Sequence, residues 1–396
     1  MKKIVKRLLK KNITIYRIAS ILRVFQISLF KIMFFLRSSS LFKIDGSKKK
    51  HPKVIQLPIT YNCNAACVMC NIWKMDHSGE MTVGEFSRFL KDQIFSEVES
   101  VGINGGEPSL VPNLNEYADE ILKLPKLKSL NIISHGFSPK PLFLQLEKIY
   151  SSCRKKNIPF HISISLDGVG SVHEKVRGRK KSFERTKSTI DEILNNPNKY
   201  CDSFDIGCTI VKQNIDNLVE LDTFAKLNGY NIRYRLGIDN KRIQSDLIRE
   251  NFTVIYSPLR QSAKEFFHYL MSISGDLNLQ YKNYAILDWL CLEMPKRLLG
   301  CAWKDEGITL DSRGELYYCA VASKSIGSLR QKGGEDIFFD SKNISYRQSI
   351  VNNECDNCIH DYHGTPQLKD LIIFLKERYF ERNSMMIYKL KTRLMF

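Results

Sequence analysis

The chain has 396 residues, of which 43% are hydrophobic, and it carries a formal net charge of +18. This length allows two or three domains, and the apolar fraction excludes an intrinsically disordered chain. The 11 cysteines are too few for a small secreted disulfide scaffold, and their clustering predicts metal ligation in a reducing, cytoplasmic setting.

The excess positive charge is concentrated at the start of the chain. Residues 1–50 contain 14 Lys or Arg and one acid, so +13 of the +18 lies there and nucleic-acid binding is not indicated. Apolar residues recur at near-helical spacing in this leader, but charges interrupt every run before the ~20 residues of a membrane span. We expect a basic amphipathic helix that lies on an anionic membrane surface, or else packs on its own domain.

After the leader, strand-like and helix-like segments alternate. The six predicted strands are Val54–Thr60, Val98–Gly105, Leu127–Ser134, Phe160–Asp167, Phe204–Val211 and Ile232–Ile238. The helices predicted between them are Thr82–Phe95, Leu114–Leu124, Pro141–Cys153, Ser182–Leu194 and Asp216–Leu227. This order predicts an α/β fold with a parallel sheet and right-handed crossovers. Six βα units are too few to close an eight-stranded barrel, so we expect an open, partial (βα)6 TIM-like barrel.

Composition divides the whole chain into five segments. We expect the basic leader over 1–50, the barrel over 51–240 and a helical connector over 241–300. A small cysteine-rich α+β domain is expected over 301–362, and a basic helix over 363–396. The two basic ends are the candidates for contact with a membrane surface.

A first cysteine group directly follows the first predicted strand, where barrel loops carry chemistry. Cys63, Cys67 and Cys70 have the spacing C-x3-C-x2-C. A short loop with this spacing can present three thiolates to three irons of a 4Fe–4S cube and leave the fourth iron open. A structural zinc loop is the alternative, although zinc prefers four ligands and the nearest further ones are Asp76 and His77.

Glycine-rich or polar segments end the later strands. They are Asn104–Pro108 (NGGEP), Ser134–Gly136 (SHG) and Ser163–Gly168 (SISLDG), and His173–Gly178 (HEKVRG) follows the last of them. The paired glycines let backbone approach a ligand closely, and Glu107 offers a carboxylate for an ammonium group. Strand alternation places Ser163, Ser165 and Asp167 on one side, which faces the barrel interior if the intervening apolar residues face the helices.

A second cysteine group lies near the end of the chain. Its members are Cys301, Cys319, Cys355 and Cys358. A β-hairpin would carry the first two thiolates, and a later turn would carry the others. Four cysteines can fill every corner of one 4Fe–4S cube, but a set of four cysteine ligands is also what structural zinc prefers. We expect the cluster and keep zinc as the alternative.

Together these motifs resemble the radical S-adenosylmethionine (SAM) superfamily, in particular the branch with a cysteine-rich SPASM/Twitch extension. The resemblance runs from about Val54 to Cys358, with a departure at Met69, where the family usually has an aromatic residue. It implies reductive cleavage of SAM at the first cluster, which gives a 5′-deoxyadenosyl radical that takes a hydrogen atom from substrate. A flavodoxin- or ferredoxin-type donor would supply the electron, and the extension would hold one auxiliary 4Fe–4S cluster.

The resemblance also implies which residues bind SAM. They are Gly105, Gly106, Glu107, Pro108, Ser134, Ser165, Asp167 and Arg177. The first four match the segment that binds the methionyl amine, and Ser165 matches the strand that contacts the ribose. Arg177 would pair with the SAM carboxylate, or form an ordinary surface salt bridge. No residue is assigned as a catalytic acid or base.

Three functions compete on these observations. We favour an oxidoreductase, a dehydrogenase by analogy with the Twitch-containing enzyme of aminocyclitol antibiotic synthesis, that acts on a sugar, cyclitol or glycan precursor. The second is a maturase of ribosomally made peptides, although a leader of 50 residues is too short for its own peptide-recognition domain. The third is a non-catalytic, zinc-containing membrane- or nucleic-acid-binding module, which leaves the placement of GGEP and SISLDG on successive strands unexplained.

Overall fold

A computed structural model of the protein describes residues 50–293, 297–360 and 369–376. The expected leader therefore lies outside the described residues, as does most of the expected C-terminal helix. No helix in the described ranges is long and apolar enough to cross a membrane.

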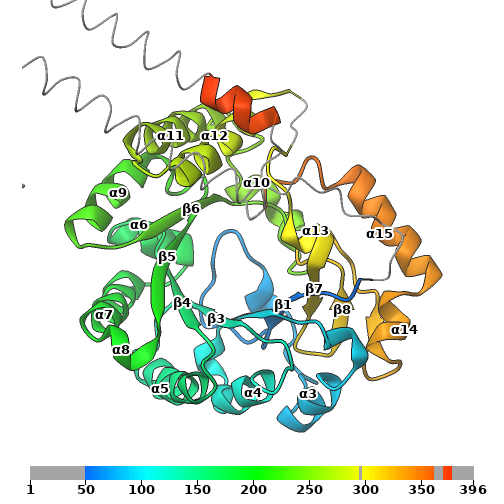
Figure 1. Ribbon diagram of the computed structural model, residues 1–396. Helices are drawn as coiled ribbons and strands as arrows, with labels where there is room; N and C mark the ends of the chain where they lie inside the picture. Colours follow the sequence, from blue (N-terminus) through cyan, green and yellow to red (C-terminus); the bar gives the residue numbers. More distant parts are fainter. Residues whose placement is uncertain (1–49, 294–296, 361–368, 377–396) are drawn as a thin grey trace, which may run out of the picture.

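One curved sheet organises the described chain (Figure 1). Its parallel strands are β1 (Val54–Pro58), β2 (Ser100–Asn104), β3 (Ser129–Ser134), β4 (Phe160–Ser165), β5 (Ser203–Ile210), β6 (Ile232–Leu236) and β7 (Gly307–Leu310). The antiparallel strands β8 (Glu315–Tyr317) and β9 (Gly327–Ser328) complete the order β6-β5-β4-β3-β2-β1-β7-β8-β9. The sheet ends in two separate edges, β6 and β9, so the predicted open, partial barrel is confirmed.

Helices connect the parallel strands and cover the outside of the curve (Figure 1). Those of the barrel are α3 (Val83–Phe89), α4 (Leu114–Ile121), α5 (Pro139–Lys155), α6 (Ser171–Arg177), α7 (Ser182–Asn195), α8 (Pro197–Tyr200) and α9 (Leu218–Leu227). The later helices are α10 (Arg249–Phe252), α11 (Arg260–Ile273), α12 (Leu277–Cys291), α13 (Ala302–Glu306), α14 (Gly334–Phe338) and α15 (Ser341–Asn353). Every strand and helix predicted for the barrel is present, and all but the first helix agree within a few residues at their ends.

The largest difference from the predicted elements lies after β1. A helix predicted over Thr82–Phe95 is divided into α3 and a short 3-10 turn, η2 (Gln93–Phe95). Thr82 and Glu85 form a capping box that begins α3. The carboxylate of Asp92 accepts a hydrogen bond from the backbone N–H of Ile94 at 3.0 Å, and this local bond starts a separate turn instead of continuing the helix.

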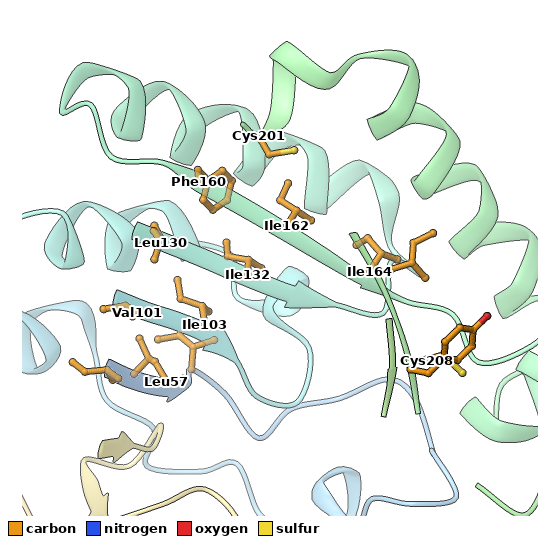
Figure 2. Close-up of a cluster of buried hydrophobic side chains, with 14 of the residues drawn as sticks. Leu57, Val101, Ile103, Leu130, Ile132, Phe160, Ile162, Ile164, Cys201 and Cys208 are labelled. Carbon is orange, nitrogen blue, oxygen red and sulfur yellow. The ribbon is translucent and has the colours of Figure 1, made fainter. Parts of the chain in front are cut away.

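Strand alternation gives the sheet an apolar outer face and a largely polar inner face. Outer residues labelled in Figure 2 are at most 1% exposed: Leu57, Val101, Ile103, Leu130, Ile132, Phe160, Ile162 and Ile164. Burying one such side chain contributes about 1.5–3 kcal/mol, so this face fixes the register of the strands. The alternate residues Gln56, Asn104, Asn131 and Ser165 line a cavity on the inner face.

The C-terminal segment continues the barrel sheet. Strand β7 pairs with β1 in parallel, with Val54 opposite Gly307. The residues expected to form a separate cysteine-rich domain thus share a sheet with the barrel. Residues 369–376 are helical, and Phe374 packs its ring on Tyr281 and Tyr284 of α12 at centroid distances of 5.2 and 5.0 Å. Where it is described, the C-terminal helix therefore packs on the protein itself.

Candidate active site

A cavity of about 560 Å³ lies against the inner face of the sheet. All six strands β1–β6 contribute to its wall, together with the loops after β1 and β6. Ala302, Trp303 and His360 close it from the C-terminal segment. This volume is in the range of sites that hold small molecules and cofactors.

The first cysteine group forms one wall of this cavity. Cys63, Cys67 and Cys70 all line it, and each is partly exposed. Burial raises the pKa of Cys63 and of Cys70 to about 12, and raises that of Cys67 as well. Since iron binds thiolates, cluster binding has to supply the free energy of deprotonation. Three thiols on one wall, with open space before them, fit a 4Fe–4S cluster that keeps one corner free.

The end of helix α6 holds the cysteine loop through its backbone. The N–H of Ala66 donates to the carbonyl of Arg177 at 3.1 Å, and the N–H of Val68 donates to the carbonyl of Val176 at 2.9 Å. Gly178 follows at a φ of +63°, and a Cβ there would lie 2.2 Å from the carbonyl oxygen of Ala66. Only glycine fits this contact. The HEKVRG run thus has a structural role that its sequence does not reveal.

The paired glycines after β2 pack against the same loop. The N–H of Gly106 donates to the carbonyl of Thr60 at 2.6 Å, and the N–H of Glu107 donates to the carbonyl of Asn62 at 2.9 Å. A Cβ on Gly106 would lie 2.1 Å from the Asn62 carbonyl oxygen, and one on Gly105 would lie 2.5 Å from that of Thr60. The close backbone approach predicted for these glycines is therefore made to the cysteine loop, while both glycines also line the cavity.

Glu107 is a buried carboxylate with a prearranged set of donors. It is 1% exposed and lines the cavity. Its Oε1 accepts hydrogen bonds from the Ser134 hydroxyl at 2.6 Å and the Ser109 N–H at 3.0 Å, and its Oε2 accepts from the His135 N–H at 3.0 Å. The His135 Nε2 atom also lies 3.2 Å from Oε2, so the fourth of about four lone-pair positions on this carboxylate faces the ring. An ammonium group that binds Glu107 would share that position and make a charge-assisted hydrogen bond there.

His135 is held as a neutral donor beside Glu107. Its Nδ1 accepts a hydrogen bond from the Phe137 N–H at 3.0 Å, so Nε2 carries the proton and donates to Asn64 Oδ1 at 2.7 Å. Burial lowers the pKa of His135 to about 4, which keeps the ring uncharged near neutral pH. His135, which directly follows strand β3, is therefore connected to the cysteine loop through Asn64.

Arg177 reaches the cysteine group, and Asp167 positions it. The Arg177 Nε donates to Asp167 Oδ2, and its Nη1 lies 3.7 Å from Cys67 Sγ. Arg177 lines the cavity, whereas Asp167 is completely buried behind it and also accepts from the Thr209 N–H at 2.8 Å. Of the residues that the sequence predicts to bind SAM, Asp167 and Pro108 do not line the cavity, and the other six do.

The second cysteine group surrounds a separate cavity of about 50 Å³. Cys301, Cys319, Cys355 and Cys358 all line it. Burial raises the pKa of Cys355 to about 12 and that of Cys358 to about 11. Backbone N–H groups donate to Cys319 Sγ at 3.2 Å and to Cys358 Sγ at 3.4 Å. Four cysteines around one cavity are the ligand set of a fully ligated cluster and also of zinc, but the described side chains are not arranged as a preformed site for a single metal ion.

Sequence reasoning missed residues that join these parts. Arg297 donates to the carbonyl oxygens of Gly300 at 3.1 Å and His360 at 2.7 Å, and so ties together the two segments that carry the second cysteine group. Trp303 and His360 line both cavities. Arg242, in the loop after β6, lines the larger one. None of these residues lies in a motif, so no sequence signal could have found them.

Comparison with known proteins identifies the domain that carries this site. The sequence model of the Radical SAM superfamily matches residues 57–225, which include the first cysteine group and strands β2–β5. The chain contains a radical SAM domain. The family uses a 4Fe–4S cluster and SAM, and the cofactors predicted from the sequence are confirmed at that level.

Several proteins are similar in sequence to this chain. Mycofactocin maturase MftC of Mycolicibacterium smegmatis is 27% identical over 323 residues, 78% of this chain and 76% of MftC. The antilisterial bacteriocin subtilosin biosynthesis protein AlbA of Bacillus subtilis is 34% identical over 135 residues, 33% of this chain and 28% of AlbA. GTP 3′,8-cyclase of Helicobacter pylori is 25% identical over 196 residues, 48% of this chain and 57% of the cyclase. The matches therefore span less than two thirds of AlbA and of the cyclase.

Solved structures share the fold. The structure of anSMEcpe with bound AdoMet and the Cp18Cys peptide superimposes with a TM-score of 0.56 at 14% identity, covering 85% of this chain and all of that one. SuiB of Streptococcus suis bound to S-adenosylmethionine gives 0.54 at 16% identity, covering 87% of this chain and 80% of SuiB. At these identities the similarity concerns the fold alone.

Proposed function

We propose that this chain is a radical SAM enzyme that modifies a peptide. The observation that carries the proposal is the similarity to MftC, a maturase, because it extends over most of both chains. AlbA, named for bacteriocin biosynthesis, and the sporulation killing factor maturation protein SkfB of Bacillus subtilis, 22% identical over 152 residues, support it. These relatives favour the peptide alternative over the sugar-type substrate that the sequence alone favours.

The fold is compatible with a peptide at the cavity. SuiB has been solved bound to the precursor peptide SuiA, and that structure superimposes with a TM-score of 0.53 at 15% identity. In the present chain the cavity lies between the barrel strands and the C-terminal segment, and Trp73, 41% exposed, and Trp303 are among its lining residues. Aromatic side chains of this kind provide large apolar contact area for an extended chain.

Different residues around the cavity would hold the cluster and SAM. Cys63, Cys67 and Cys70 would hold the 4Fe–4S cluster, and Glu107 would accept a hydrogen bond from the amine of SAM. Five more residues would surround the rest of SAM: Gly105, Gly106, Ser134, Ser165 and Arg177. When bound, the cluster and SAM together supply a 5′-deoxyadenosyl radical for hydrogen abstraction. The second cysteine group would hold the auxiliary cluster in a Twitch-type segment.

The test is an assay on anaerobically reconstituted protein with SAM and dithionite. Synthetic peptides encoded by short reading frames beside the gene are compared with nucleotide sugars, and each is supplied with deuterium at carbon. We expect a peptide to transfer deuterium to 5′-deoxyadenosine and to change in mass, and we expect neither result with a nucleotide sugar. Deuterium transfer from a nucleotide sugar, with none from any peptide, would contradict the proposal.

Two variants control this assay. The triple variant Cys63→Ala, Cys67→Ala and Cys70→Ala should cleave no SAM, because it lacks the three thiols on the cavity wall. The matched variant Cys291→Ala removes an exposed cysteine that lines neither cavity, and it should keep full activity.

A further inference from the structure

Arg242, in the cavity wall, keeps hydrogen-bond donors that have no partner. It lies in the loop after β6, is 9% exposed and lines the 560 Å³ cavity. Its Nε and Nη1 atoms are buried without a hydrogen-bond partner. A buried guanidinium with unpaired donors is costly, so a protein that keeps one there gains from pairing it with an anion.

The carboxylate next to this group is already committed elsewhere. Asp311 is 1% exposed, and its Oδ2 accepts hydrogen bonds from the hydroxyls of Tyr61 at 2.7 Å and Tyr317 at 3.0 Å. Its Oδ1 accepts from two backbone N–H groups of the β7–β8 turn, both at 2.9 Å. Arg242 and Asp311 both lie near the Tyr61 hydroxyl, but the Nε and Nη1 donors of Arg242 have no hydrogen-bond partner, Asp311 included.

The loop that carries Arg242 is fixed at both the barrel and the C-terminal segment. Asn240 Oδ1 accepts a hydrogen bond from the Arg242 N–H at 3.1 Å, and the Lys241 N–H donates to the carbonyl of Val321 at 2.9 Å. The side-chain amide of Asn71, next to the first cysteine group, donates to a carbonyl of the same loop at 2.9 Å. A group presented in this way loses little conformational entropy on binding a ligand.

The other charged groups of the cavity wall are paired inside the protein or exposed. Arg177 is paired with Asp167, and Glu107 accepts three hydrogen bonds. Arg235 is exposed, with its Nε 3.4 Å from the Thr209 hydroxyl, so water can reach its remaining donors. Arg242 is therefore the buried arginine of the wall that keeps donors without a partner.

We propose that Arg242 binds a carboxylate of the substrate, either an acidic side chain or the carboxyl terminus of a peptide. A carboxylate provides acceptors for several N–H groups of one guanidinium and neutralises its charge in a largely desolvated site. The peptide part of this inference rests on the proposed function, whereas the carboxylate site rests on Arg242 and its surroundings.

The test measures binding of small probes to the full-length, reconstituted enzyme saturated with SAM. One pair is the methylamides of N-acetylglutamate and N-acetylglutamine, which differ only in a side-chain carboxylate. The other is N-acetylalanine and its amide, which represent a chain terminus. Isothermal titration should give at least about tenfold tighter binding for the carboxylate in one of the pairs, since hydrogen bonds between charged groups are the stronger ones.

Variants test whether the preference for carboxylate probes depends on Arg242. Arg242→Gln should abolish it, Arg242→Lys should retain part of it, and Arg249→Gln should leave it unchanged. Arg249 is a matched control because it lies seven residues further on, is partly exposed and pairs with Asp239 at 3.2 Å outside the cavity. Equal binding of both members of each pair to wild-type enzyme, or a preference that survives Arg242→Gln, would overturn the inference.

Two further outcomes separate this inference from others. Loss of SAM binding in Arg242→Gln, with no probe preference in the wild type, would assign the guanidinium to the SAM carboxylate and overturn the inference. A probe preference that depends on Arg242, in an enzyme that modifies no peptide, would uphold the carboxylate site and refute only the proposed peptide substrate.

Discussion

Arg177 donates a hydrogen bond through Nε to Asp167, whose carboxylate is completely buried. The pair joins two motifs, SISLDG and HEKVRG, that lie at opposite ends of the β4–α6 connection. It also aims the Arg177 guanidinium at Cys67, with Nη1 at 3.7 Å from Sγ. The cysteine wall of the cavity is thus backed by a buried ion pair.

Replacing Asp167 by Asn should destabilise the protein strongly. The amide can still accept from the Thr209 N–H, but Arg177 would remain as an unpaired buried charge, which typically costs about 3–5 kcal/mol in the free energy of unfolding. Urea unfolding measures this loss. Glu250→Gln is the control, since Glu250 is 73% exposed beside Arg249, and it should change stability little.

Replacing Gly106 by Ala should displace the cysteine loop. A Cβ at this position would lie 2.1 Å from the carbonyl oxygen of Asn62, and backbone on both sides has no room to move aside. We expect lower iron retention after reconstitution and slower SAM cleavage. Gly84→Ala in α3, where the new Cβ would meet nothing closer than 3.9 Å, should leave both unchanged. Normal iron content in Gly106→Ala would show that the loop tolerates the shift.

The fold was predictable because its signals are local. Ile162 and Ile164 alternate with Ser163 and Ser165, and that period of two indicates a strand with one buried face wherever it occurs. The spacing of Cys63, Cys67 and Cys70 can likewise be recognised within one loop, and all three residues do line the main cavity.

The contacts that shape the site were not predictable, since they join distant residues. Tyr61 and Asp311 are 250 residues apart, and nothing near either one signals the 2.7 Å hydrogen bond between them. Arg242 lies in no motif, and its burial depends on the loop's attachment to Val321 in the C-terminal segment. Asp167 seemed a cofactor ligand from its position on the inner face, but Arg177 occupies the space between Asp167 and the cavity.

Acid should destabilise the protein through His135. Burial places its pKa at about 4 in the folded chain, against 6.5 in an unfolded one. As pH falls below about 6.5, the unfolded state takes up the proton first, so stability declines down to about pH 4 and is unaffected above pH 7. The loss amounts to about 3 kcal/mol. Urea unfolding of the metal-free protein at several pH values measures it.

A substitution shows how much of this acid sensitivity belongs to His135. In His135→Gln the decline between pH 6.5 and pH 4 should be shallower, although His173, whose pKa burial lowers to about 3, still contributes. His77→Gln, which changes an exposed histidine, is the control. An unchanged slope in His135→Gln would show that other groups govern the acid response.

The basic leader should bind anionic lipid. We expect intact protein to float with vesicles that contain phosphatidylserine at low salt and to dissociate as salt rises, because each Lys or Arg near such a surface contributes about 1 kcal/mol. Deleting residues 1–46 should abolish flotation and spare SAM cleavage. Absence of binding by the intact protein at low salt would leave the leader as a packing helix.

The second cysteine group should hold iron. Reconstituted protein should contain about eight irons per chain if both sites hold 4Fe–4S clusters, but about four irons and one zinc if the second site is structural. Metal analysis distinguishes the two. The triple variant of the first cysteine group should keep the metal of the second site, because the two groups line different cavities.

Removing half of the second group should separate electron transfer from structure. Cys301, Cys319, Cys355 and Cys358 would leave no open iron on a 4Fe–4S cluster, so a cluster held there would serve as an electron acceptor if the reaction oxidises the substrate. Trp303 and His360 line both cavities and place this site beside the substrate space. In the double variant Cys355→Ala and Cys358→Ala, a relay predicts nearly normal SAM cleavage with little product. A structural metal predicts a different result. Its loss would loosen the two cysteine segments that Arg297 holds together, so SAM cleavage and thermal stability would be lost together.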